Sequence, residues 1–487
     1  MSWFATKSID DLKARLGEAR LDRVLGPVDL TMLGIGAIIG TGIFVLTGQA
    51  AAMHAGPAIV LSMVLAGIVS ALAALCYAEF AAAVPVAGSA YTYGYATLGE
   101  VIAWIIGWDL ILEYALGAAT VAVGWSGYVV RFLDDLGLRF PPLLSAAPGT
   151  AVVLDDGSAA TAILNLPAVL IAILATILLV IGIRESARVN AVIVGLKVAV
   201  VLLIIGIGGM FVSADYWQPF IPENTGTFGS FGWSGILRGA GVIFFAYIGF
   251  DAVSTAAQET RNPQRDLPYG IFASLIICTV LYVLVSGVMV GLVPYQQLGT
   301  PAPMALAVDA ARVKSAGTSW ESIANLLPLV VNLGAIAGLS STIIVQMMAQ
   351  PRIFMSMAQD GLLPRWAGAI HPRFHTPHVT TIITGAIVTL AAGLTPIDVL
   401  GELVSIGTLF AFVVVAIGVI VLRKTRPDLE RPFRMPWVPW LPAASAVSSF
   451  ALMASLSADT WIRLIIWMVL GMVIYVGYGY KHSALRR

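Results

Sequence analysis

Four glycines, at Gly34, Gly36, Gly40 and Gly42, gather in the stretch GIGAIIGTGIF inside an otherwise apolar run. Each glycine costs a helix about 1 kcal/mol relative to alanine, so a continuous helix gains nothing from them. If the helix is interrupted here, the first N–H groups of its second half have no helical partner and can bind an anionic group. Close helix packing through a small-xxx-small pattern is the alternative explanation.

A second interruption is predicted in GAGVIFFAYIGFDAVSTAAQE, residues 239–259. The helix is expected to unwind at Tyr247, Ile248 and Gly249, just before Asp251. The two stretches are five apolar segments apart, so they would cross a membrane in opposite directions. Unpaired backbone at the centre of a membrane is tolerated only against protein or a water-filled cavity. Paired interruptions are therefore typical of a transporter binding site, and the second one makes packing alone a weaker explanation of the first.

Three charged residues deep in apolar segments add to this hypothesis. Lys197, in NAVIVGLKVAVVLLIIG, is too far from either end of its segment to reach the membrane surface. A buried ammonium group needs a partner, and Glu113 in WIIGWDLILEYALG is the candidate. Asp251 could carry a proton or orient the interrupted segment, although any of the three could also belong to an inert ion pair. Carboxylates closer to segment ends are expected to be structural: Glu79, Asp109 and Glu402.

The composition indicates that lipid surrounds most of the chain. Of 487 residues, 59% are hydrophobic and 11% charged, whereas a soluble domain carries about 25% charged residues. Twelve stretches are long and apolar enough to cross a bilayer. They predict an all-α integral membrane protein with spans near 29–53, 57–84, 99–130, 162–183, 190–213, 235–257, 268–293, 323–357, 379–397, 400–422, 437–457 and 460–480.

Basic residues in the connections predict the orientation. Of the 27 lysines and arginines, 20 fall on the side that holds both termini and six on the opposite side, so both termini are expected in the cytoplasm. The two interrupted segments suggest a five-plus-five inverted repeat followed by two further spans. The predicted parts are a cytoplasmic amphipathic segment 1–28, repeats 29–213 and 235–422, two additional spans in 437–480, and a cytoplasmic end 481–487.

Several motifs, in this order, resemble the amino acid-polyamine-organocation superfamily, and most closely the twelve-span bacterial form of its cationic amino acid transporter group. They are GIGAIIGTGIF, PVAGSAYTYGYATLGE (85–100), FFAYIGFDAVSTAAQETRNPQRDLP (244–268), MAQDGLLP (357–364) and VLRKTRPDLERPFRMPWVP (421–439). The resemblance covers the chain from about residue 26 onward. It implies two inverted five-helix repeats with discontinuous helices 1 and 6, and proton-linked or exchange-type amino acid transport.

The resemblance assigns roles around a bound amino acid. The N–H groups near Gly40, Thr41 and Gly42 would hold its carboxylate, because they lie at the positive end of a half-helix. Backbone carbonyls would accept the three ammonium hydrogens. Phe245 resembles an aromatic lid, with an ordinary core residue as the alternative, and Gln346 is a polar side chain expected to face the pocket. The expected carbonyls belong to Ile38, Phe245, Ala246 and Ile248.

The position of Lys197 also carries an implication from the resemblance. Sodium-coupled relatives of this fold bind a cation where the fifth helix approaches helices 1 and 8. A lysine ammonium there resembles a built-in replacement for sodium that ties the broken helix 1 to helix 8 near Ser340 and Ser341. Transport is therefore expected to be independent of sodium and sensitive to protons.

The substrate stays open at this point between two groups of amino acids. The pocket residues are small and apolar apart from Asp251 and Gln346, which favours neutral amino acids such as alanine; a cationic amino acid, or exchange of the two, is the alternative. No catalytic cluster or nucleotide motif suggests an enzyme or an ATP-driven pump, and two unlike half-helices in one chain disfavour a channel. No cofactor or nucleic acid is expected. No metal is expected either, although HPRFHTPH (371–378) contains three histidines. The protein is expected to act as a monomer or with a small membrane-protein partner.

Overall fold

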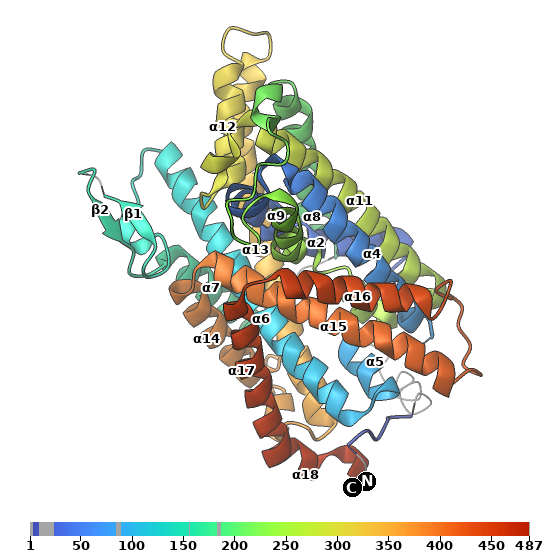
Figure 1. Ribbon diagram of the computed structural model, residues 1–487. Helices are drawn as coiled ribbons and strands as arrows, with labels where there is room; N and C mark the ends of the chain where they lie inside the picture. The colour runs from blue at the N-terminus through green and yellow to red at the C-terminus, as the bar shows by residue number, and fades with distance from the viewer. Residues whose placement is uncertain (1–2, 9–23, 84–88, 155, 183–186, 487) are drawn as a thin grey trace.

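The computed structural model describes residues 3–8, 24–83, 89–154, 156–182 and 187–486, which form a helical bundle with one small hairpin (Figure 1). Most of the predicted segment 1–28 thus lies outside the described residues, as do 84–88 of the second motif. The helices of the first half are α2 (Pro27–Ile38), α3 (Thr47–Ala50), α4 (Ile59–Ala83), α5 (Ser89–Thr97), α6 (Glu100–Asp135), α7 (Leu166–Ile181) and α8 (Ala187–Leu203). Those that follow are α9 (Gly232–Ile243), α10 (Ala252–Thr255), α11 (Pro263–Leu292), α12 (Pro303–Lys314), α13 (Glu321–Gln359), α14 (His378–Leu394), α15 (Ile397–Thr425), α16 (Trp440–Ser455), α17 (Ala458–Ile474) and α18 (Tyr480–His482).

Both predicted interruptions are present. The first predicted segment consists of α2 and, after a break, a chain of short helical turns from Gly42 to Ala55. The sixth consists of α9, a 3-10 turn Phe244–Tyr247, a non-helical stretch and α10. Each of the other ten predicted segments also contains a helix, with ends that differ by a few residues. The arrangement as twelve spans in two repeats stays a prediction.

Length and hydropathy support a membrane environment. Seven helical stretches among the described residues are long and apolar enough to cross a bilayer, and four shorter helices, α2, α7, α14 and α16, are also apolar. Large aliphatic side chains are exposed along the outer faces of α7 and α17, for example Leu170, Leu174, Ile466 and Val473. Apolar surfaces of this extent have no favourable contact with water, so these faces contact lipid.

Two elements outside the predicted segments lie at the end of α6. Strands β1 (Ala151–Val153) and β2 (Ala159–Thr161) pair antiparallel through a turn that contains Asp156 and Gly157. Gly157 has φ +82°, which an Asp-Gly turn accommodates without strain. Helix α12 also lies outside the predicted segments, and it packs against α13 and α11.

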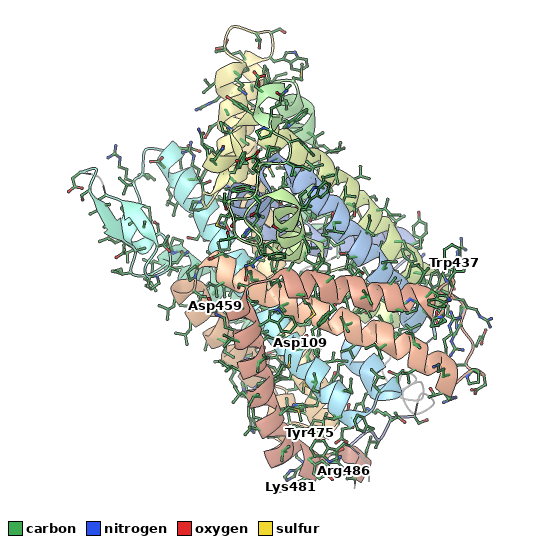
Figure 2. The ribbon with its side chains drawn as sticks, in the orientation of Figure 1. Asp109, Trp437, Asp459, Tyr475, Lys481 and Arg486 are labelled. Carbon is green, nitrogen blue, oxygen red and sulfur yellow. The ribbon has the colours of Figure 1, made fainter. Side chains whose placement is uncertain are left out.

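Residues 3–8 and 480–486 lie together at the opposite end of the molecule, and we call this pair of segments the terminal clasp (Figure 1). Glu100, which is 0% exposed at the start of α6, accepts hydrogen bonds from Tyr475, Ser483 and Tyr95 and pairs with Arg486 at 3.0 Å. Figure 2 shows Tyr475, Lys481 and Arg486 at this same end.

The other half of the clasp reaches α13. The ammonium of Lys7 lies 2.5 Å from Asp360, which follows the last residue of α13, and Tyr91 donates to the same carboxylate at 2.8 Å. The backbone N–H of Ala484 donates to the Asp360 carbonyl at 2.9 Å. The clasp therefore connects α5 and α6 with the end of α13.

Candidate functional site

The first helix breaks where the glycine pattern predicted. Helix α2 ends at Ile38, and Ile39 turns the chain away with φ −72° and ψ 98°. Helical structure resumes at Thr41 and passes into a π-helical turn at Gly42. The first N–H groups of the resumed helix, near Gly40 to Gly42, have no acceptor within the helix and lie at its positive end.

The carbonyl groups at the end of α2 are partly occupied by side chains. The phenol of Tyr282 donates to the Ile38 carbonyl at 2.8 Å, and the ammonium of Lys197 donates to the Gly36 carbonyl at 2.9 Å. A carbonyl oxygen has two lone pairs, so Ile38 keeps one acceptor position for a ligand. Tyr282 was not predicted, because nothing in a single sequence shows which residue of α11 faces the break.

The second break has a different backbone. After the 3-10 turn, Ile248 is extended at ψ 138° and Gly249 has φ +119°, a conformation that side chains other than glycine rarely adopt. The Phe245 N–H donates to Ser405 on α15 at 3.1 Å, and its carbonyl accepts from the N–H of Ile248 at 3.2 Å. These contacts fix the turn, and they leave Phe245 5% exposed.

The two breaks lie directly against each other. A Cβ atom added to Gly42 would lie 2.3 Å from the Ala246 Cα, and one added to Gly249 would lie 2.8 Å from the Ala37 carbonyl carbon. Gly40 has more room, since its added Cβ would lie 3.5 Å from the nearest atom, a methyl carbon of Thr342. Gly42 thus permits the close approach of two backbones, and Gly40 leaves space beside the half-helix.

Two buried polar atoms that pack against α6 have no hydrogen-bond partner among the described residues: the Thr41 hydroxyl at the first break, and the side-chain oxygen of Gln346 on α13. Both pack against glycines of α6, because a Cβ at Gly124 would lie 2.7 Å from Thr41 and one at Gly117 would lie 2.8 Å from Gln346. Unpaired buried polar atoms are costly, so a polar group that reached them would be stabilised there.

Lys197 bridges two helices, as the resemblance implied, but with a different partner on the eighth predicted segment. Its side chain is 1% exposed, and its ammonium donates to Gly36 of α2 at 2.9 Å and to the Thr342 hydroxyl of α13 at 2.8 Å. The expected contact was near Ser340 and Ser341. Trp125 donates instead to the Ser340 hydroxyl at 2.9 Å, and Ser341 donates back to its own helix.

The expected pairing of Lys197 with Glu113 is wrong. Among the described residues, the charged groups that interact electrostatically with Glu113 are Asp251 and Asp109, whereas Lys197 donates to α2 and α13. Asp109 is four residues before Glu113, so both carboxylates lie on one face of α6. The partner of Lys197 could not be read from the sequence because it depends on how distant helices pack.

Asp109, Glu113 and Asp251 form what we call the acidic cluster. Their side chains are 0%, 2% and 3% exposed, and both carboxylate oxygens of Asp109 lack a hydrogen-bond partner within the described part of the chain. Figure 2 shows Asp109 within the bundle. Three buried carboxyl groups repel one another when all are ionised, so the cluster is suited to hold a proton or a cationic group. Asp109, which the sequence suggested to be structural, is thus a member of this buried cluster.

Glu79 and Glu402, the other two carboxylates that the sequence suggested to be structural, are in ion pairs. Glu79 receives two hydrogen bonds from Arg423, at 2.9 and 2.7 Å, and one from the backbone N–H of Met435. Glu402 pairs with Arg238 at 2.7 Å. Both contacts agree with the structural role that the sequence suggested for these residues.

The junction of the breaks is closed to the outside in this conformation. Residues of both breaks are buried: Ile39 is 0% exposed and Phe245 is 5% exposed. Thr41 is 0% exposed and Ile248 is 7% exposed. A ligand can therefore reach the junction only after part of the bundle moves.

Interrupted helices that enclose a buried polar site in a multi-pass helical membrane protein define the class of membrane transporters. The chain belongs to the amino acid permease family, whose model matches residues 25–475. It is a transporter and not an enzyme.

Relatives align along most or all of the chain. The branched-chain amino acid permease BcaP of Bacillus subtilis (strain 168) is 46% identical over 100% of this chain and 99% of its own length. The methylthioribose transporter of the same organism is 43% identical over 100% of both chains. The vacuolar cationic amino acid transporter 4 of Arabidopsis thaliana is 40% identical over 85% of this chain and 65% of its own length.

Proposed function

We propose that the protein is a sodium-independent, proton-coupled transporter of neutral amino acids that works by alternating access in the plasma membrane, with twelve spans in two inverted repeats and both termini in the cytoplasm. The observation that carries the proposal is the junction of the two breaks. The first N–H groups of the resumed helix, after Gly40, lie against the turn that carries the carbonyls of residues 245–248, with the unpaired hydroxyl of Thr41 beside them and Gln346 packed further along α6. These are the groups that a carboxylate and an ammonium require.

Neutral aliphatic side chains suit this junction best. The sequence favours small substrates such as alanine, and a relative of this chain is named for branched-chain amino acids. We therefore place the substrate between alanine and leucine in size. The acidic cluster supports a cationic amino acid as the second candidate, since three carboxylates near the break could receive a cationic side chain.

A competition panel on the reconstituted protein decides between these substrates. We expect alanine, valine and leucine to inhibit uptake of labelled alanine, and lysine and arginine to inhibit it weakly. Ethylamine, which lacks the carboxylate, should compete about 100-fold less well than alanine, because the charge-assisted hydrogen bonds at the half-helix have no replacement. Equal inhibition by ethylamine would contradict the anchoring role of residues 40–42. Strong inhibition by arginine would instead select the cationic substrate.

Replacing sodium with choline on both sides of the membrane is expected to leave uptake unchanged. The ammonium of Lys197 already bridges α2 and α13, so no cation is needed to join them. Initial rates in proteoliposomes at fixed pH measure this directly, with potassium as a second replacement ion to exclude an effect of choline itself. A steep dependence on sodium concentration would show that Lys197 does not take the place of a bound cation.

A further inference from the structure

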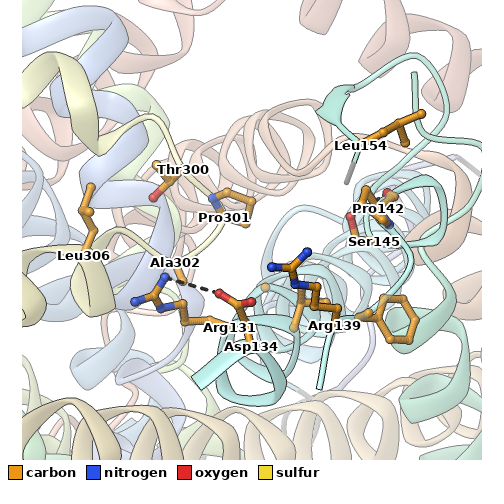
Figure 3. A pocket seen from close by; sticks show the side chains of 13 residues that line it. Arg131, Asp134, Arg139, Pro142, Ser145, Leu154, Thr300, Pro301, Ala302 and Leu306 are labelled. Carbon is orange, nitrogen blue, oxygen red and sulfur yellow. Dashed lines mark hydrogen bonds and ion pairs between the residues drawn. The ribbon is translucent and has the colours of Figure 1, made fainter. Parts of the chain in front are cut away.

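A cavity of about 580 Å³ lies at the end of α6 that is remote from the terminal clasp (Figure 3). Its wall is formed by α6, the loop that follows it, the hairpin, and the segment that leads into α12. Pockets of about 300–1,000 Å³ are the usual size of small-molecule sites. The polar side chains that line it belong to Arg131, Asp134, Arg139, Ser145 and Thr300.

Both signs of charge face this cavity. In the view of Figure 3 the Asp134 carboxylate lies between the guanidinium groups of Arg131, with which it forms an ion pair, and Arg139. The Thr300 hydroxyl, also in the wall, is buried and has no hydrogen-bond partner among the described residues. A positive group, a negative group and an unpaired hydroxyl around one cavity match the groups of a zwitterion.

Arg131 has another role at the edge of the cavity. It lies 2.5 Å from Asp309 of α12, 3.4 Å from Asp135 and 4.0 Å from Asp134. Asp135 in turn accepts a hydrogen bond at 2.8 Å from Asn332 of α13. Burial raises the pKa of Asp309, although Arg131 opposes the shift, so the ion pair between α6 and α12 weakens as the pH falls through this raised value. Arg131 therefore connects α6 with α12 beside the cavity through an ion pair.

One face of α6 connects the cavity with the junction of the breaks. Gly127 lines the cavity, and its added Cβ would lie 2.7 Å from the Pro301 carbonyl oxygen. Gly124, one helical turn away on the same face, packs against Thr41, and Gly117 packs against Gln346 two turns further. A molecule in the cavity is thus separated from the closed junction by about one turn of α6 and by the segment before α12.

We propose that this cavity is a second amino acid site, an outer docking site where the substrate carboxylate binds at Arg139 and the ammonium at Asp134 before the molecule moves to the broken helices. The inference rests on the proposed function, since it gives the cavity the same substrate. Release of the Arg131 contact with α12 would then open the short path along α6.

Arg139→Gln and Asp134→Asn, singly and together, test the docking site in proteoliposomes with labelled alanine and leucine. Exposed charge pairs have modest energies, so we expect the KM for uptake to rise about 3-fold in each single variant and about 10-fold in the double variant. The maximal rate should stay close to the native value, because the junction of the breaks is unchanged. In native protein KM should also rise with ionic strength, and in the double variant this dependence should disappear.

Arg463→Gln and Asp459→Asn are the matched controls, because both residues are exposed at the start of α17, on the same predicted side, and neither lines the cavity. The controls should keep the native KM and its dependence on salt. A double cavity variant with native KM and native salt dependence would overturn the docking site while leaving the proposed function intact. Native protein that takes up neither amino acid would instead refute the proposed substrate, and the docking site with it.

Discussion

Lys197→Met is expected to fold and to lose both rapid uptake and its response to a pH gradient. Methionine keeps most of the volume that packs against Gly338, whose added Cβ would lie 2.9 Å from the lysine chain. It cannot donate to the Gly36 carbonyl or to Thr342, so α2 and α13 lose their connection. Hydrogen bonds of a charged donor contribute about 1.5–3 kcal/mol each, so we expect uptake to fall about 100-fold or more. The measurement is alanine uptake at imposed pH gradients.

Lys314→Met is the matched control for this substitution. Lys314 also donates to two backbone carbonyls, of Phe211 and Leu292, but at the end of α12 and with its side chain exposed. This variant should keep the native response to pH. If Lys197→Met accumulates alanine against a gradient as native protein does, Lys197 is only structural and the proton site must be sought in the acidic cluster. Lys197→Ala, which also removes the packing, should be the less stable of the two Lys197 variants.

Gly42→Ala is expected to abolish uptake and to lower the thermal stability of the protein. Its new methyl group would meet backbone atoms of Ala246, including Cα at 2.3 Å, and a backbone cannot move aside as the end of a flexible side chain can. The two breaks must therefore separate, at a cost of about 1–3 kcal/mol. Unfolding temperature in detergent and alanine uptake in proteoliposomes measure the two effects.

Gly40→Ala is a milder change two residues away and separates substrate binding from folding. Its methyl group would contact Thr342 at an ordinary 3.5 Å, so the unfolding temperature should stay native. Because the methyl group occupies space beside the free N–H groups, the KM for alanine should rise about 10-fold. Native KM in this variant would show that the carboxylate is held elsewhere, and native stability in Gly42→Ala would show that the breaks can separate without cost.

The positions of both breaks could be predicted because their causes are local. Glycines weaken a helix wherever they occur, and Gly249 adopts the positive φ that its residue type allows. The same reasoning could have found the hairpin, since Asp156 and Gly157 form a strong turn signal between two short apolar runs. Strands of three residues are too short to be recognised as membrane-spanning segments.

Contacts between distant helices could not be predicted in the same way. The sequence shows that Lys197 is buried, but only the packing of α8 against α2 and α13 selects Thr342 over Ser340 and Ser341. Asp109 is a different case. Its spacing of four residues from Glu113 indicates that both carboxylates share one face of the helix. Its position closer to the end of the segment indicated a structural role instead.

The terminal clasp gives the chain a built-in order of assembly. Residues 3–8 are synthesised long before residues 480–486, but the two segments share their contacts at Asp360 and Glu100. Until residues 475–486 are synthesised, the buried Glu100 carboxylate lacks the partners Tyr475, Ser483 and Arg486, and burying a charge with few partners is costly. A chain that lacks residues 475–486 therefore leaves this end of α6 without these contacts, and only a chain synthesised through them can form the clasp.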